Sequence, residues 1–142
     1  MDRVMPFELP LPADPASVGV ARRYFASVTA AAGVPAGVRQ AGALAVSELV
    51  TNAVLHGREP ITLRVTPMPR TVRVAVTDGS DRPPRPRARN RTEPLRPDRR
   101  SGDHGRGLTI VESVADRWGC SPAVQSSGKT VWCDLSVVRT DS

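Results

Sequence analysis

The chain has 142 residues and a formal net charge of +6, and its length favours a single domain over residues 1–142. The positive charge is local. Residues 82–100 hold eight arginines and only two acidic residues, a surplus of six, while the rest of the chain has 12 basic and 12 acidic residues. The composition therefore argues against a uniformly basic fold of the kind that binds nucleic acid over its whole surface.

Two kinds of segment are missing from the sequence. No apolar stretch approaches the roughly 18 residues of a membrane helix, and prolines 6, 10 and 12 interrupt the N-terminal segment. We therefore expect a cytoplasmic, soluble protein that does not contact a membrane. Cys120 and Cys133 have no metal-type spacing to each other or to His56 and His104, so we expect two buried free thiols and no zinc site.

The first half of the chain predicts one strand and two helices. Apolar residues alternate with polar or proline residues over 7–11, as in an edge strand. A helix capped by Asp14 or Ser17 extends to about residue 32, and Gly33 ends it. A longer helix extends from Pro35 to about residue 56. The apolar stripe of this second helix is Val38, Ala41, Ala45, Leu49 and Ala53.

The second half predicts mainly strands. A hairpin with strands at 61–65 and 72–76 is followed by a third helix from Gly107 and by two closing strands at 118–122 and 129–138. This order of elements predicts an α+β protein. We expect a two-layer sandwich in which helices cover one face of a mixed, mostly antiparallel sheet.

Between Asp78 and Gly107 the sequence has no periodicity. The segment has 28 residues and is rich in Arg, Pro, Gly and Asp. This length is unusual for a structureless connection within a compact domain. Such a loop is usually either a functional lid or a disordered segment.

Glu48, Asn52 and His56 are spaced four residues apart on the second helix, so their side chains share one face. This face borders the apolar stripe. A carboxylate and an amide there offer oxygen ligands to a hard cation such as Mg²⁺, and the carboxylate can act as a general base. The alternative is a solvated flank on which Glu48 pairs with a nearby arginine.

Asp78 directly follows the strand that ends at Thr77. A carboxylate held at the end of a strand can accept a hydrogen bond from an exocyclic amine such as that of adenine. The alternative is an aspartate that only initiates a turn, because Asp-Gly is a common turn sequence.

A glycine-rich segment, residues 102–107, immediately precedes Leu108 at the expected start of the third helix. Free backbone N–H groups at a helix N-terminus favour phosphate binding, although a flexible hinge is the alternative. The later Ser-Gly-Lys-Thr at 127–130 is not a P-loop, because position 123 is alanine and the residues that follow alternate as a strand.

These motifs in this order, with Gly128 to Trp132 near the end, resemble the histidine-kinase-like (Bergerat-fold) ATPases. Within that superfamily the size and the two leading helices are similar to the anti-sigma-factor serine kinases. The resemblance covers residues 7–138.

The resemblance implies roles for the helix motif and for the long loop. Asn52 would coordinate the Mg²⁺ that bridges the phosphates of ATP. Glu48 would be the catalytic general base that activates a serine hydroxyl on a partner protein. Residues 79–104 would form the ATP lid.

The resemblance also implies the remaining contacts to the nucleotide. Asp78 would bind the adenine amine, and Thr130 would lie near the adenine. Gly105, Gly107 and Leu108 would approach the phosphates.

The implied function is that of an ATP-binding anti-sigma factor, with a sigma factor and an antagonist protein as partners and with serine kinase activity toward the antagonist. One alternative is a non-catalytic partner-binding module of the same fold. A remote alternative is a nucleic-acid binder that uses residues 82–100, although this stretch has no aromatic residues for stacking on single strands. The alternatives also include a homodimer of this chain.

Overall fold

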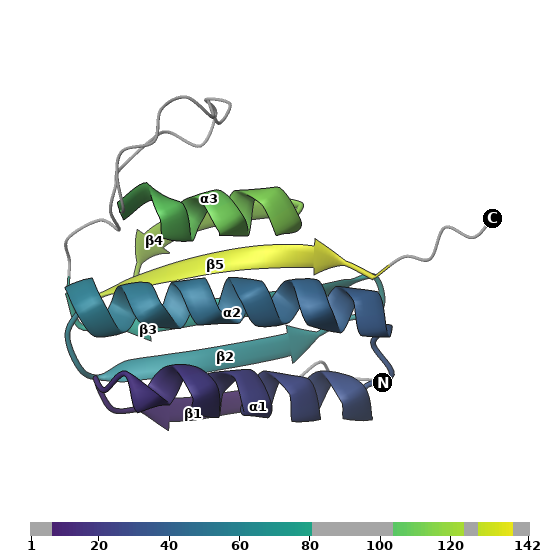
Figure 1. Cartoon of the computed structure of the whole chain (residues 1–142), viewed down its shortest axis with the longest axis horizontal. Helices are drawn as coiled ribbons and strands as arrows, with labels where there is room; N and C mark the ends of the chain where they lie inside the picture. The colour runs from purple at the N-terminus through teal and green to yellow at the C-terminus, as the bar shows by residue number, and fades with distance from the viewer. Residues whose placement is uncertain (1–6, 81–103, 124–127, 138–142) are drawn as a thin grey trace.

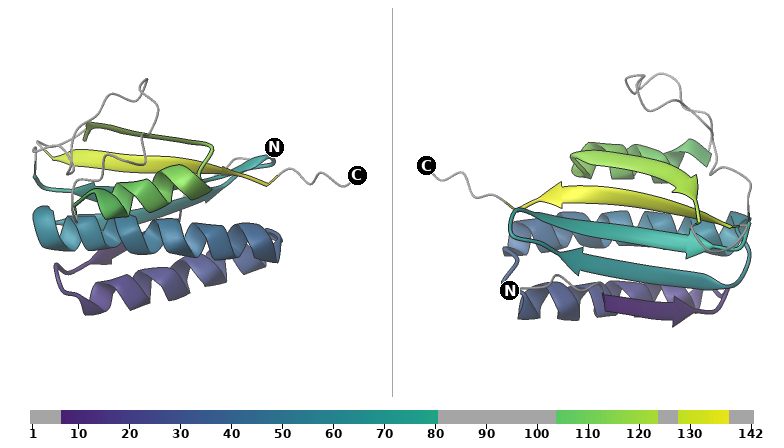
Figure 2. Two further views of the ribbon diagram at one scale, coloured as in Figure 1. Left: turned by 45° about the horizontal axis from the view of Figure 1, so that its top comes forward. Right: turned by 180° about the vertical axis from the view of Figure 1, so that it is seen from behind.

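The computed structural model describes residues 7–80, 104–123 and 128–137 (Figure 1). Its elements, in chain order, are β1 (Phe7–Leu11), α1 (Ala16–Ala31), α2 (Ala36–His56), β2 (Ile61–Pro67), β3 (Thr71–Asp78), α3 (His104–Val114), β4 (Arg117–Pro122) and β5 (Lys129–Ser136). The five strands form one sheet in the order β1-β2-β3-β5-β4, and every neighbouring pair is antiparallel. In the described part of the chain the helices cover one face of this sheet (Figure 2), which confirms the α+β sandwich expected from the sequence.

The centre of the sheet is the pair of strands β3 and β5. Alternate residues of both strands face the helices, so one side of the sheet is apolar and buried, as the period of two requires. The register places Asp78, the last residue of β3, opposite Lys129, the first residue of β5. The neighbouring residues, Thr77 and Thr130, are also opposite each other, and they face the other side of the sheet.

Helix α2 lies in the middle of the helical layer, between α1 and α3 (Figure 1). Ala45, Leu49 and Ala53 of the expected stripe are buried, but Val46 and Val50 are also completely buried. The buried face of α2 is therefore wider than the apolar stripe that the sequence predicts. A stripe of that width suits a helix covered on one side, whereas α2 packs on two helices as well as on the sheet.

The ends of α1 follow from local hydrogen bonds. The Asp14 carboxylate accepts a hydrogen bond of 2.8 Å from the N–H of Ala16, the first residue of the helix. The Ser17 hydroxyl donates to the carbonyl of Pro12 at 2.7 Å. At the other end Gly33 has a φ of 77°, a left-handed conformation that favours glycine and lets the chain turn into α2.

Helix α3 begins at His104, three residues earlier than the sequence predicts. Glycines at 105 and 107 lower helix propensity, which is why the pattern indicated a later start. The expected ATP lid at 79–104 lies almost wholly outside the described residues, which include only Gly79, Ser80 and His104 of it.

The face of the sheet opposite the helices carries a buried carboxylate. Asp134 accepts hydrogen bonds from Arg73 at 2.7 and 2.9 Å and from Arg117 at 3.2 Å. These bonds raise the pKa of Arg73, whose guanidinium also stacks over the ring of Trp132 at 4.3 Å. The cluster ties β3, β4 and β5 together on this face. None of the helices in the described ranges is long and apolar enough to cross a membrane.

Gly42 offers a test of the contact between α1 and α2. A Cβ at this position would overlap the ring of Phe25, which is fully buried. We expect Gly42→Ala to lower the free energy of unfolding, because overpacking costs about 1–3 kcal/mol and outweighs the roughly 1 kcal/mol that alanine contributes in a helix. Urea denaturation measures the change. Gly37→Ala, on the same helix with no atom within 4 Å of the added Cβ, is the control and is expected to be neutral or stabilising.

The two cysteines differ, contrary to the expectation of two buried thiols. Cys133 is buried, whereas Cys120 on the edge strand β4 is exposed. Burial raises the pKa of Cys133 to about 12 from its ordinary 9.0. Since folding raises this pKa, the thiol favours the folded state below pH 9, and the contribution is lost as the pH rises toward 12.

We therefore expect iodoacetamide to label one thiol of the folded protein and both thiols in urea, as counted by mass spectrometry. Cys120→Ser is expected to leave the folded protein unlabelled near neutral pH. Two labels on the folded wild type would contradict the placement of Cys133.

Candidate functional site

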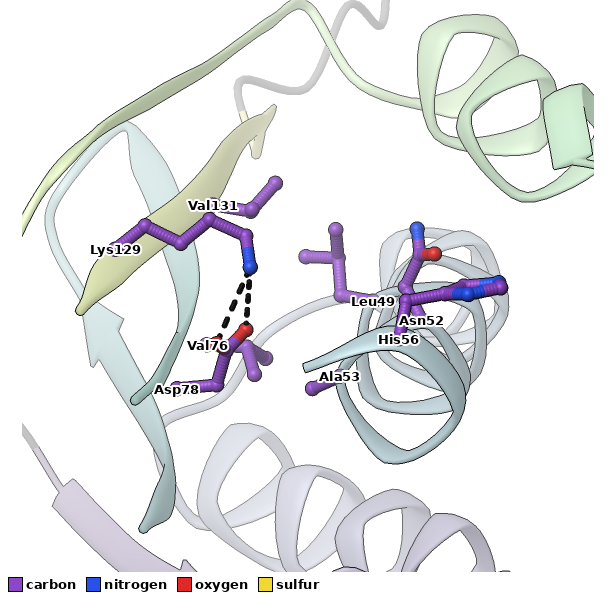
Figure 3. Close-up of a pocket in the computed structure, with 8 residues that line it drawn as sticks. All are labelled: Leu49, Asn52, Ala53, His56, Val76, Asp78, Lys129 and Val131. Atoms are coloured by element: carbon purple, nitrogen blue, oxygen red, sulfur yellow. Dashed lines mark hydrogen bonds and ion pairs between the residues drawn. The ribbon is translucent and has the colours of Figure 1, made fainter. Parts of the chain in front are cut away.

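A pocket lies between the C-terminal half of α2 and the adjoining ends of β3 and β5 (Figure 3). Both strands present to it the residues that face the helices, because the antiparallel register puts the end of β3 beside the start of β5. The lining residues are Leu49, Asn52, Ala53 and His56 from α2, Val76 and Asp78 from β3, and Lys129 and Val131 from β5.

Asp78 and Lys129 form a buried ion pair on one wall of this pocket. The Lys129 Nζ lies 2.9 Å from Oδ2 and 3.1 Å from Oδ1 of Asp78, and the two side chains are only 9% and 3% exposed. The Asp78 Oδ1 also accepts a hydrogen bond of 2.7 Å from the N–H of Ser80. The carboxylate is therefore held in one orientation by the residue that follows the strand and by a cation from the neighbouring strand (Figure 3).

Two glycines make room for this pair. A Cβ on Gly57, just past the end of α2, would lie 2.6 Å from Cγ and Oδ2 of Asp78. A Cβ on Gly128 would overlap the carbonyl of Asp78. Gly57 therefore ends α2 and also lets the chain pass directly beside the carboxylate.

The helix wall of the pocket carries two of the three residues in the predicted helix motif. Asn52 is half-buried and His56 is exposed, and both line the pocket. Glu48 lies one turn earlier on α2, is half-buried, and is not among the lining residues. The structure thus brings Asn52 and Asp78 to opposite walls of one pocket, and it leaves Glu48 beside that pocket.

The amide oxygen of Asn52 fits a magnesium ion held mainly by a ligand. Mg²⁺ commonly takes only one or two protein oxygens and completes its coordination with phosphate and water oxygens. An amide from α2 therefore suffices as the protein's share, provided that a polyphosphate supplies the other oxygens.

The predicted phosphate-binding residues lie in the first turn of α3. Because α3 begins at His104, the N–H groups of Gly105 and Gly107 are among the first four of the helix, which have no partner within it. Leu108 follows in the same helix, which packs beside α2. A helix N-terminus of this kind fits an anion.

Thr130 was expected near the adenine, but its side chain faces the other side of the sheet. Its hydroxyl makes a hydrogen bond of 2.7 Å with the hydroxyl of Thr77, and Thr130 is not among the lining residues. Lys129 and Val131, on either side of it, line the pocket instead. The sequence does contain a signal for Lys129. Alternate residues of a strand face the same side of a sheet, so Lys129 is expected on the same side as Val131 and Cys133.

The family model of the histidine kinase-like ATPase domain matches residues 11–133. The chain belongs to this family. The match confirms the superfamily that the motifs resembled, and family membership implies ATP binding.

A solved structure shares the fold of this histidine kinase-like ATPase domain. The crystal structure of the RsbU and RsbW domains of a Mycobacterium tuberculosis protein superposes with a TM-score of 0.65 at 18% sequence identity. The alignment covers 96% of this chain and 33% of that one, so this domain spans about a third of the length of the protein it matches. No curated protein matches the sequence.

The buried ion pair gives the site a measurable energetic signature. We expect Lys129→Met to lower the free energy of unfolding by about 3–5 kcal/mol, because it leaves the Asp78 carboxylate buried without its cation. The double variant Lys129→Met with Asp78→Asn is expected to lose much less than the sum of the two single changes, as a double-mutant cycle in urea would show.

The exposed pair Glu8–Arg64 is the matched control, because it also joins opposite residues of neighbouring strands in the same sheet. Its side chains are 48% and 45% exposed. Arg64→Met is expected to cost less than about 1 kcal/mol. A similarly small cost for Lys129→Met would contradict the burial of the Asp78–Lys129 pair.

Proposed function

We propose that this domain binds Mg-ATP in the pocket between α2 and the β3–β5 pair and acts as an anti-sigma factor with serine kinase activity toward an antagonist protein. The observation that carries the proposal is the buried carboxylate of Asp78, which lines the same pocket as Asn52 in a histidine kinase-like ATPase domain. This arrangement offers an acceptor for the adenine amine on one wall and an oxygen ligand for Mg²⁺ on the other.

Different residues of the site contact different parts of the nucleotide. Asp78 accepts a hydrogen bond from the exocyclic amine of the base, and the apolar side chains of Leu49, Val76 and Val131 exclude water from the base. Asn52 holds the metal at the phosphate end. Gly105 and Gly107, at the start of α3, donate backbone hydrogen bonds to the phosphates.

Glu48 is the proposed catalytic residue. The γ-phosphoryl group of ATP passes to the serine oxygen as its bond to the β-phosphate oxygen breaks, and ADP is the leaving group. The Glu48 carboxylate accepts the proton of the partner's serine hydroxyl, so that the hydroxyl oxygen becomes the better nucleophile. Glu48 lies one turn before Asn52, so the base and the metal ligand are on the same helix.

The proposed partners are a sigma factor and the antagonist that carries the serine. This assignment depends on the resemblance to the anti-sigma-factor serine kinases, and the shared fold with the RsbU and RsbW domains is compatible with it. Residues 79–104 are proposed to be the ATP lid.

A second candidate is a regulator of the same fold that binds its partner without catalysis. The observation that favours it is the position of Glu48, which is outside the set of residues that line the described pocket. The two candidates differ in catalysis, so phosphorylation of the antagonist separates them.

Calorimetric titration with Mg-ATP tests nucleotide binding directly. We expect the wild type to bind, and Asn52→Ala to bind at least about tenfold more weakly, because it removes the protein's metal ligand. Chelation of Mg²⁺ is expected to lower the affinity of the wild type for ATP and to abolish the difference in affinity between the wild type and Asn52→Ala. The control is Gln40→Ala, which changes an exposed amide on the same helix. Absence of binding by the folded wild type would overturn the proposal.

The kinase step is tested with radiolabelled ATP and a cognate antagonist. We expect phosphoserine on the antagonist, and we expect Glu48→Gln to reduce its rate of formation by about 10²- to 10⁴-fold, the usual contribution of a general base. ATP affinity is expected to stay unchanged in this variant. Equal rates for Glu48→Gln and the wild type would remove Glu48 as the base, and no phosphoserine with either protein would favour the non-catalytic candidate.

A further inference from the structure

No sequence motif assigns a role to Lys129, yet this residue lies on the pocket wall beside Asp78 (Figure 3). Its ammonium is held at the end of the sheet by the β3–β5 register and by the close approach of Gly128 to the backbone of Asp78. A lysine side chain that is about nine-tenths buried is unusual unless its charge and its donors are used.

Both members of the pair keep hydrogen-bonding capacity that the described residues do not use. An ammonium has three N–H donors, and the hydrogen bonds of Lys129 within the described residues all go to the two oxygens of Asp78. At least one donor therefore has no partner there. A carboxylate offers about four acceptor positions, and Asp78 uses three of them, two for Lys129 and one for the N–H of Ser80.

The pair thus presents an acceptor and a donor side by side, with the Asp78 Oδ2 and the Lys129 Nζ 2.9 Å apart on a wall of the pocket. A ligand that satisfies both must carry a donor next to an acceptor. The Watson–Crick edge of adenine has this pattern, because its exocyclic amine donates and the adjacent ring nitrogen N1 accepts.

We propose that Lys129 is a further base-contacting residue, in which the ammonium donates to the ring nitrogen N1 of adenine while Asp78 accepts from the amine. This inference depends on the proposed binding of ATP at Asp78. It makes base selection a property of two residues, since a base that lacks either the amine or the neighbouring acceptor leaves a buried polar group without a partner.

The ion pair stays intact when the base binds. Withdrawal of the ammonium would leave the Asp78 carboxylate buried with only a neutral amine as its new partner, and an unpaired buried charge costs far more than one neutral hydrogen bond returns. The base therefore binds to the pair and does not replace Lys129.

The decisive experiment uses the wild-type protein and two nucleotides. Calorimetry compares Mg-ATP with Mg-1-deaza-ATP, in which a C–H group replaces the ring nitrogen N1 and the amine and the phosphates are unchanged. We expect 1-deaza-ATP to bind roughly 10- to 100-fold more weakly, the usual loss when a hydrogen bond to a charged group is removed. Equal affinities would overturn the role of Lys129 and leave ATP binding in place. Absence of binding by either nucleotide would overturn the proposed function, and this inference with it.

Two variants then assign the effect to Lys129. In Lys129→Met the affinity for ATP is expected to fall to that for 1-deaza-ATP, so that the discrimination between the nucleotides disappears. In Arg64→Met, which removes an exposed cation from the same sheet, the discrimination is expected to persist. Because Lys129→Met can lower stability, its folded fraction is checked first, and the double variant Lys129→Met with Asp78→Asn offers a second protein without the donor.

The outcomes are distinct. An equal fall in both affinities in Lys129→Met would indicate a purely structural role and would overturn the proposal. Tighter binding of ATP by Lys129→Met would show that the ammonium blocks the base, which also overturns it.

Discussion

Helix α2 contacts both other helices of the described chain and the strands β2, β3 and β5, so its packing limits where each of them can lie. Small residues along it, among them Gly42, Ala45 and Ala53, let its neighbours approach closely. The same burial fixes the helix against the ends of β3 and β5. A pocket between one helix and two strand ends keeps its shape only if those three elements cannot slide, and the packing of α2 supplies that constraint.

The electrostatics of the site follow from this burial. A carboxylate taken out of water at the end of β3 needs a partner, and the antiparallel register supplies one by placing Lys129 opposite Asp78. On the opposite face of the sheet, Arg73 and Arg117 are the charged partners of the buried Asp134 carboxylate. The difference is exposure to a pocket: Asp134 is paired with two arginines of its own sheet, whereas Asp78 lines the pocket and keeps an acceptor position that its hydrogen bonds do not use.

Most of the fold could be predicted from the sequence because its signals are local. Alternation of apolar and polar residues indicated β1, β2, β3 and β5, the 3.6-residue period and the flanking Pro and Gly indicated α1 and α2, and the order of elements indicated the two layers. The errors fall where local signals fail. Val46 and Val50 were left out of the core because the number of neighbours around a helix is not a local property. The late start expected for α3 reflects glycines that lower helix propensity although the helix includes them.

The family could be recognised without the structure, because Glu48, Asn52, Asp78 and the glycine-rich segment occur in a characteristic order along the chain. Only the tertiary structure decided which side chains meet. It placed Asn52 opposite Asp78, left Glu48 beside the pocket, turned Thr130 to the far face of the sheet and put Lys129 on the carboxylate. The physical reason is that a contact between α2, β3 and β5 depends on strand register and helix position. These are set by the packing of residues far apart in the chain, and a shift of one residue in register would exchange Lys129 for Thr130.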